Sequence, residues 1–182
     1  NEVIKRDPRI AVVGIAGPGD PFAEPEKTLE TLKRVRESYP EMLLCVASNG
    51  LNVAPYAQDL AAVGTSHVTI TVNAVDAAVA AEIYAWVRHK KRVYRGLDAG
   101  KVMLEQQLEA VRALKKHDLI LKINTIAIPG VNEDHVVEVA RAMKTEGADI
   151  LNLMPLCNVP GTPFENLGEV PDEKMNLLRK KA

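Results

Sequence analysis

The residues best suited to chemistry in this sequence form a loop, residues 14–22, directly after the apolar run 10–13. The loop contains three glycines and two prolines. Glycine lets a ligand approach the main chain closely and permits positive φ angles, whereas proline stiffens the bend. Asp20 places one carboxylate at the end of the expected strand, where it can hold an amine. The same spacing also fits an ordinary strand-to-helix turn with Asp20 as a turn residue.

The composition indicates the class of protein to which this loop belongs. The 182 residues are 47% hydrophobic, which predicts one domain, residues 1–182, with a core of ordinary size. A net charge of -1 argues against a nucleic-acid partner. No apolar run approaches the roughly 20 residues of a membrane helix and no signal peptide begins the sequence, so we expect a cytoplasmic protein without a membrane partner.

One basic cluster, residues 88–92, departs from this balance. It fits a solvated basic helix end, or a site for a small anion or an acidic partner. The two cysteines, Cys45 and Cys157, lie far apart and form no CxxC pair. Their spacing therefore indicates neither a zinc site nor a disulfide framework.

Strand-like and helix-like segments alternate along the chain. The strands are expected at residues 10–15, 42–48, 67–74, 119–128 and 149–156. The helices are expected at residues 25–38, 54–63, 76–87, 100–117 and 132–146. Repeated strand-then-helix units predict a parallel sheet with right-handed crossovers, either doubly wound or part of a barrel.

The third strand helps to choose between these two folds. Val68, Ile70 and Val72 share one face of it, and Thr69, Thr71 and Asn73 share the other. A strand buried on both sides of a doubly wound sheet is nearly all apolar, whereas a ligand-holding barrel can present Thr and Asn inward. Lys122 and Asn124 repeat the pattern on the next strand. We therefore expect an α/β fold, a partial (β/α) barrel with outer helices, and weigh it against an ordinary packed barrel interior.

Ligand-like residues recur where the expected strands end, the edge at which α/β folds gather their active sites. They are Asp20, residues 48–50, Asn73, residues 129–133 and residues 157–158. Each one alone also fits a turn or a cap: Asn49 with Gly50 is a common turn pair, and Asn132 suits a helix N-cap. Their recurrence favours a site.

Five segments together resemble one family, the radical S-adenosylmethionine maturases of the nitrogenase cofactor. They are Gly-Ile-Ala-Gly-Pro-Gly-Asp-Pro-Phe at 14–22, Leu-Cys-Val-Ala-Ser-Asn-Gly-Leu at 44–51, His-Val-Thr-Ile-Thr-Val-Asn at 67–73, Ile-Tyr-Ala-Trp-Val at 83–87, and Asn-Leu-Met-Pro-Leu-Cys-Asn-Val-Pro-Gly-Thr-Pro-Phe at 152–164. The resemblance covers nearly the whole chain. It implies a barrel of the radical S-adenosylmethionine type, a [4Fe-4S] cluster that chelates S-adenosylmethionine, and reductive cleavage of that molecule.

The same resemblance implies the reaction and its partners. Family members fuse two further [4Fe-4S] clusters around a carbide taken from the methyl group, giving an Fe8S9C precursor. The expected partners are S-adenosylmethionine, iron–sulfur cluster donors and the cofactor carrier proteins of nitrogenase assembly. The expected class is a lyase-type, metal-binding enzyme of nitrogen fixation.

Site residues follow from the resemblance position by position. Gly17, Pro18, Gly19 and Asp20 would receive the methionine amine, Ser48 and Asn49 would lie near the methionine or ribose, and Thr71 and Asn73 would lie beside them. The stretch 128–133 resembles the adenine-side motif, with Ile123, Asn124 and Ile126 on the strand that leads into it. The sequence leaves open which parity of that strand touches the nucleoside.

Cys45 has two interpretations. A free cysteine in an apolar strand is usually a small buried hydrophobe. By the resemblance, however, Cys45 would be a metal ligand to a substrate iron–sulfur cluster, since thiolate is the preferred protein ligand of such clusters.

The sequence departs strongly from the family pattern in its cluster ligands. It contains neither the CxxxCxxC signature that holds the radical-generating cluster, nor the upstream His and Cys, nor the later CxxC. Two cysteines cannot supply three thiolates, so we expect a fragment, inactive alone, whose [4Fe-4S] ligands lie outside the chain. Two other functions stay open: a cluster-free α/β-barrel lyase or aldolase with Lys122 as Schiff-base amine, and a cluster carrier or interaction module.

Overall fold

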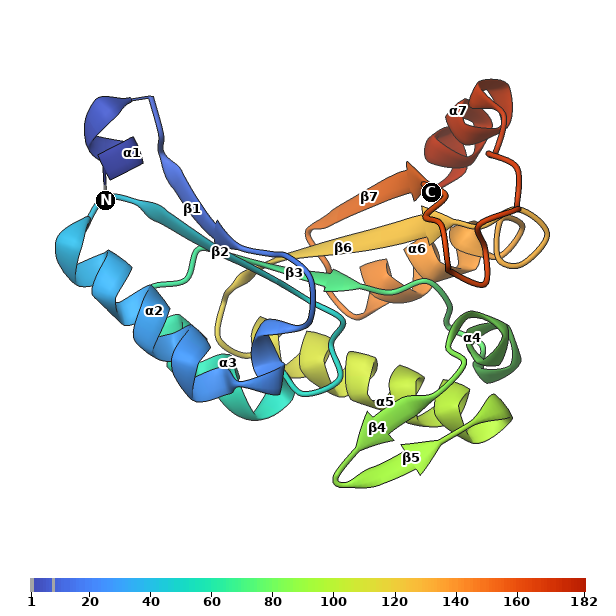
Figure 1. The fold of residues 1–182 in the computed structure, drawn as a ribbon, viewed down its shortest axis with the longest axis horizontal. Helices are drawn as coiled ribbons and strands as arrows, with labels where there is room; N and C mark the ends of the chain where they lie inside the picture. The colour runs from blue at the N-terminus through green and yellow to red at the C-terminus, as the bar shows by residue number, and fades with distance from the viewer. Residues whose placement is uncertain (1, 8) are drawn as a thin grey trace.

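A computed structural model describes residues 2–7 and 9–182, and one parallel five-stranded sheet forms its centre (Figure 1). The strands are β1 (Val12–Ile15), β2 (Leu43–Ser48), β3 (His67–Thr71), β6 (Ile120–Ala127) and β7 (Ile150–Pro155). They lie in the order β1-β2-β3-β6-β7, without a reversal. A doubly wound sheet reverses its strand order, whereas a barrel does not. The predicted partial (β/α) barrel with parallel strands and outer helices is therefore confirmed.

The described residues form seven helices, and part of this set covers one face of the sheet (Figure 1). They are α1 (Glu2–Arg6), α2 (Pro25–Ser38), α3 (Ala57–Ala62), α4 (Ala77–Ile83), α5 (Gly96–Lys115), α6 (Val136–Thr145) and α7 (Asp172–Lys181), with short 3-10 turns η1 (Pro21–Ala23) and η2 (Ala54–Tyr56). Figure 1 shows α2, α3 and α5 on the same side of the sheet. The opposite, concave face is free of these helices.

The helix α2 has the predicted bounds, and its ends have local causes. Pro25 occupies the first turn, where its missing N–H is not needed. Leu32 is buried against the sheet, and Tyr39 ends the helix just before Pro40. Proline disfavours the α conformation in the residue that precedes it, so the helix stops there.

The main core lies between the sheet and these helices. Leu44, Val68 and Leu121 from the strands pack with Leu32 of α2 and Leu114 of α5, and all five side chains are fully buried. A second cluster joins the ends of β6 and β7 to α6 and α7 through Ala127, Leu153 and Met175. Since hydrophobic burial provides the main driving force, the helix-covered face fixes the sheet and leaves the other face for function.

The side chains of β3 and β6 alternate between the two faces of the sheet as predicted. Val68 and Ile70 point into the main core, so Thr69 and Thr71 lie on the opposite face. On β6, Leu121 and Ile123 point into the core, and Lys122 and Asn124 are half-buried on the concave side.

The prediction of a helix over residues 76–87 is wrong for its last four residues. The helix α4 ends at Ile83, and an antiparallel hairpin follows, β4 (Val87–His89) paired with β5 (Arg92–Tyr94). The basic cluster 88–92 is therefore a hairpin tip and not a helix end. Its turn residues Lys90 and Lys91 both have positive φ, 47° and 66°. Val87 and Tyr94 pack against α5 and hold the hairpin on the body.

Two further helix bounds differ from the prediction. The helix α5 starts at Gly96 rather than at residue 100, and α6 starts at Val136 rather than at residue 132. Asn132 is not the N-cap of α6, because His135 occupies that position and the Asn132 side chain bonds elsewhere. In the part of the chain that the structure describes, no helix combines the length and apolar character needed to cross a membrane.

Candidate functional site at the carboxyl edge of the sheet

The five parallel strands end at one edge, and polar side chains form a row there on the concave face. Thr71, Asn124 and Asn152 are neighbours in register across β3, β6 and β7. The Asn152 side-chain amide donates to Asn124 Oδ1 at 3.2 Å. Asn152 was not among the predicted site residues, although the alternation of β7 places it on this face. The row supplies amide and hydroxyl groups that can bind a polar ligand.

The glycine loop after β1 is held by Asp20. The Asp20 carboxylate accepts hydrogen bonds from Phe22 N at 2.9 Å, from the Ser48 hydroxyl at 2.8 and 3.1 Å, and from Asn49 N at 2.6 Å. These bonds join the ends of β1 and β2. All three donor groups are neutral, and Asp20 forms no ion pair with any residue that the structure describes. Its negative charge is therefore available to a cationic group.

The loop itself is open to a ligand. Gly19 has a φ of +89°, a conformation that L side chains rarely adopt, and a Cβ added at Gly17 would meet nothing within 4 Å. Gly17, Pro18 and Gly19 are exposed. A pocket of about 530 Å³ lies between this loop and α2, lined on the helix side by Lys27 and Thr28. The loop can therefore be approached closely, as the glycines predicted.

The turn after β2 is organised by its own side chains. The Ser48 hydroxyl accepts from Gly50 N at 3.1 Å, and Asn49 Oδ1 accepts from Leu51 N at 2.8 Å. Gly50 has a φ of +87°, and a Cβ there would approach Gln107 and Ile70 to 3.0 Å. The turn therefore requires glycine for both its conformation and its packing.

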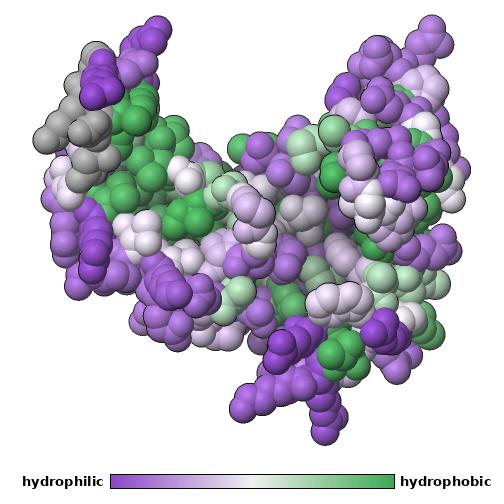
Figure 2. Space-filling model, viewed as in Figure 1, coloured by the Kyte–Doolittle hydropathy of each residue, from purple (hydrophilic) through white to green (hydrophobic). Residues whose placement is uncertain are grey.

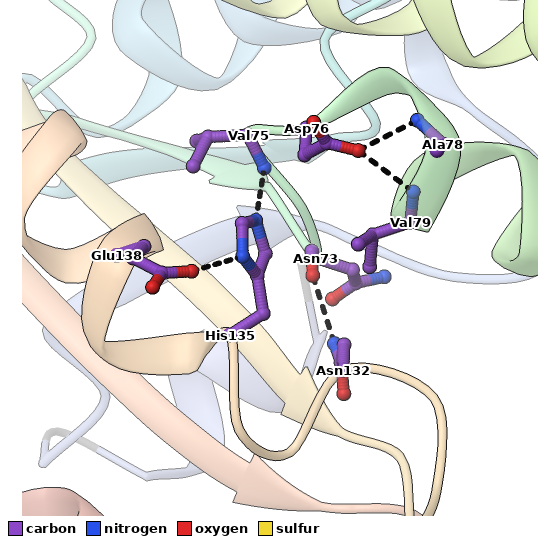
Figure 3. A network of polar contacts seen from close by, with 8 residues as sticks. All are labelled: Asn73, Val75, Asp76, Ala78, Val79, Asn132, His135 and Glu138. Atoms are coloured by element: carbon purple, nitrogen blue, oxygen red, sulfur yellow. Dashed lines mark hydrogen bonds and ion pairs between the residues drawn. The ribbon is translucent and has the colours of Figure 1, made fainter.

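The end of β3 is tied to the loop after β6 by two asparagines (Figure 3). The Asn132 amide donates to the carbonyls of Asn73 and Ile126, each at 2.8 Å, and Asn132 Oδ1 accepts from Ile128 N at 2.7 Å. Asn73 Oδ1 accepts from Ile126 N at 2.9 Å. Both asparagines are buried. Much of the hydrogen-bonding capacity of Asn73 therefore serves the fold.

A histidine makes a second link between these loops (Figure 3). Val75 N donates to His135 Nε2 at 3.1 Å, and His135 Nδ1 faces the Glu138 carboxylate. This pairing assigns the ring proton to Nδ1. Asp76 caps α4 through Ala78 N and Val79 N, and these backbone bonds hold the pKa of its carboxyl below the usual value.

The fold shows which side chains of β6 lie on the concave face. Ile123 lies fully buried in the core against the helices, whereas Asn124 and Ile126 lie on the concave face. A ligand on the concave face can therefore meet Asn124 and Ile126 but not the side chain of Ile123.

Cys45 lies deeper on the concave face, three residues before the end of β2. Its thiol contacts Thr69 and lies near Lys122. Burial raises the thiol pKa, and the Lys122 charge and the Thr69 hydrogen bond oppose that rise. Cys157, after β7, is exposed. Among the described residues no group of three or more His, Cys, Asp or Glu side chains could hold a metal ion.

The concave face is accessible in the space-filling view. In Figure 2 the surface is hollowed between the part of the molecule that contains β1 and the part that contains β7 and α7 (labelled in Figure 1). Half-buried Cys45, Thr71, Lys122 and Asn124 lie on this face and are therefore only partly covered. Residues predicted from three separate strands thus share one surface.

Comparison with known proteins defines the class of this site. A profile of the Radical SAM superfamily matches residues 2–143, and the chain belongs to that superfamily. Two solved structures share the fold: methylornithine synthase (PylB), with a TM-score of 0.61, and anSMEcpe with bound AdoMet, with a TM-score of 0.53. Each is 17% identical; the matches cover 94% and 84% of this chain, and 48% and 41% of those chains.

Relatives with higher identity carry one name. The FeMo cofactor biosynthesis protein NifB of Chlorobaculum tepidum is 55% identical over 96% of this chain, and that of Klebsiella pneumoniae is 43% identical over 100%. NifB of Methanocaldococcus infernus is 39% identical over 100%. The chain spans 41%, 39% and 59% of these relatives. The resemblance predicted from the five sequence segments is confirmed.

The residues present do not fit the superfamily's [4Fe-4S] cluster. That cluster needs three thiolates, and the sequence holds only two cysteines, one on the concave face and one exposed after β7. These residues alone therefore cannot hold that cluster. The edge does fit a polar ligand with a cationic group, because Asp20 keeps an uncompensated charge beside an open glycine loop.

Proposed function

We propose that this chain is the S-adenosylmethionine-binding core of a nitrogenase-cofactor maturase. The reaction is the fusion of two [4Fe-4S] clusters and the insertion of a carbide from the methyl group of S-adenosylmethionine, giving an Fe8S9C precursor. The observation that carries the proposal is the similarity of nearly the whole chain to three NifB proteins at 39 to 55% identity. The class is a lyase-type enzyme of nitrogen fixation.

In this proposal S-adenosylmethionine lies along the carboxyl edge. Its methionine ammonium pairs with Asp20, an interaction supported by the neutral donors on that carboxylate, which forms no ion pair with any described residue. Gly17, Pro18 and Gly19 let the methionine approach the main chain. Ser48, Asn49, Thr71 and Asn73 surround the methionine or ribose, with Asn73 acting mainly through its position.

The nucleoside lies toward β6. Asn124 and Ile126 are proposed contacts because both lie on the concave face. Ile123 is not a proposed contact, because its side chain is buried in the core. Asn152 joins the proposed set because it is in register with Asn124. The loop 128–133 closes the adenine side.

Cys45 is proposed as a ligand of a substrate cluster on the concave face. The support is its half-buried position on the concave face; burial raises the pKa of the free thiol, and the nearby Lys122 charge partly opposes that rise. A strand rises about 3.3 Å per residue, so Cys45 lies roughly 10 Å below the end of β2. That depth separates the cluster substrate from S-adenosylmethionine at the edge. Cluster donors and cofactor carrier proteins are the proposed partners, in the cytoplasm.

Methyl-labelled S-adenosylmethionine tests this function. The assay uses a protein of the relatives' full length that carries this chain, below called the full-length protein, reconstituted without oxygen. The proposal expects label in a new iron–sulfur species. A lyase that uses Lys122, or a carrier that only holds a cluster, gives no such species, so unlabelled product would reject the proposal.

A further inference from the structure

The side chain of Gln107 is a buried amide on α5 that reaches under the carboxyl edge. The residue is 2% exposed. Its Nε2 donates to the carbonyl of Asn49 at 3.0 Å and to the carbonyl of Thr71 at 2.7 Å. Both partners are acceptors, so the nitrogen of the amide, and not its oxygen, must face them. One side chain therefore joins the ends of β2 and β3.

The Gln107 amide is also linked to Asn73, through the hydroxyl of Tyr84. Gln107 Nε2 lies 3.5 Å from the Tyr84 hydroxyl, and that hydroxyl bonds with the Asn73 side chain. Burial raises the pKa of Tyr84, and the hydrogen bonds with the Gln107 and Asn73 side chains oppose that rise. Asn49, Thr71 and Asn73 are thus all connected to Gln107 directly or through one hydroxyl.

Packing fixes the position of this amide. Gly50 turns with its α-carbon against the Gln107 side chain, where an added Cβ would come within 3.0 Å of Gln107 Cγ. Val111 and Ala110, next on α5, are fully buried in the main core. Since interiors are close-packed, the turn after β2 cannot move without displacing Gln107.

We propose that Gln107 is a positioning residue for S-adenosylmethionine, which it does not touch. It holds the Asn49 and Thr71 carbonyls in fixed places, so that the side chains of Ser48, Asn49 and Thr71 are preorganised for the ligand. Preorganised groups bind more tightly because less motion is lost on binding. This inference rests on the proposed function, in which those side chains surround the ligand.

Two substitutions and one control separate positioning from stability. Gln107→Met keeps the length of the side chain and removes its donors, while Gln107→Glu keeps the shape and presents a carboxylate to two carbonyls. Gln106→Met is the control, because the side chain of Gln106, half-buried on the same helix, bonds among the described residues only to the exposed Glu109. Affinity for S-adenosylmethionine is measured by calorimetry in the full-length protein, with thermal unfolding of each variant beside it.

At pH 8 we expect the dissociation constant to rise at least tenfold in both Gln107 variants and by less than twofold in Gln106→Met. Burial favours the neutral form of a carboxyl, and a protonated Glu regains one donor. The Gln107→Glu variant should therefore recover affinity, relative to wild type, when the pH falls from 8 to 6. If Gln107→Met fails to fold, Gln107→Glu still tests the inference, because its protonated carboxyl keeps one donor at pH 6.

Several results would overturn the inference. Wild-type affinity in Gln107→Glu at both pH values would do so, as would an equal loss in Gln106→Met, because each shows that the amide does not set the site. A wild-type protein that does not bind S-adenosylmethionine overturns the proposed function, and this inference with it. Normal wild-type binding with unaffected variants overturns this inference alone.

Discussion

The Ser48 hydroxyl lies 2.8 Å from Asp20 Oδ2 and joins the loops that follow β1 and β2. Asp20 thus has two tasks in the proposed site: it fixes the glycine loop through neutral donors, and it offers its charge to an ammonium group. The two tasks can be separated, since an asparagine at position 20 would keep an acceptor oxygen for the loop but carry no charge.

Replacing Asp20 tests the second task. Asp20→Ala should raise the dissociation constant for S-adenosylmethionine roughly tenfold or more, because a charged hydrogen bond contributes about 1.5–3 kcal/mol. Asp20→Asn keeps one acceptor oxygen for the loop but removes the charge, so it should raise the constant nearly as much. Calorimetry on the full-length protein gives both values, and wild-type affinity in Asp20→Asn would count against an ammonium at Asp20.

Asn132 should be a main determinant of stability in the loop after β6. It is 1% exposed and makes three hydrogen bonds to the main chain. Asn132→Ala leaves these buried groups without partners, at a cost of at least about 2 kcal/mol of unfolding free energy. Urea unfolding measures the cost. Asn166→Ala, at an exposed position, is the matched control, and a similar small change in both would reject the interpretation.

The hairpin turn should gain stability from a different pair of residues. Lys90 and Lys91 both adopt positive φ, which costs an ordinary residue about 1–2 kcal/mol, and two-residue hairpin turns prefer Asn-Gly. The double substitution Lys90→Asn with Lys91→Gly should raise the unfolding free energy by about 1 kcal/mol. Because neither lysine side chain forms an ion pair with a described residue, little is lost. Unchanged or lower stability in urea unfolding would show that the turn differs from this description.

The Asp149 carboxylate should account for part of the loss of stability of the fold in acid. The pKa of its carboxyl lies below the usual value for an aspartate, chiefly because Leu121 N donates to the carboxylate at 2.8 Å, with help from Lys115. The unfolded chain then binds the proton more readily, so this stabilisation is present above about pH 4 and is lost as the pH falls through the lowered value. Asp149→Asn should flatten the pH dependence of the urea midpoint between about pH 4 and pH 2. Parallel curves for the two proteins would contradict this.

The repeated strand-then-helix order and the alternation of the third strand together predicted the fold class from sequence. Thr69 and Thr71 opposite Val68 and Ile70 distinguish a barrel wall from a strand buried on both faces, and the structure has that arrangement. Such patterns are local, with a period of two, and a short segment reveals them.

Other features are not local and were not predicted. The pattern of α4 continues into Trp86 and Val87, and Lys90 with Lys91 lacks the turn signal of Asn-Gly, so the hairpin was missed. Gln107 resembles any polar residue on an amphipathic helix. Its partners Asn49 and Thr71 lie 58 and 36 residues away, and only the packed fold brings them together.

The decisive measurement for the proposed function is the transfer of methyl label from S-adenosylmethionine into an iron–sulfur product, in wild type and in Cys45→Ala. In the full-length protein the wild type should transfer label. The variant should still cleave S-adenosylmethionine, with a stability loss of only about 1–2 kcal/mol, but should form no labelled precursor. Normal precursor formation by Cys45→Ala would return Cys45 to a packing role, and a wild type without labelled product would contradict the proposed function.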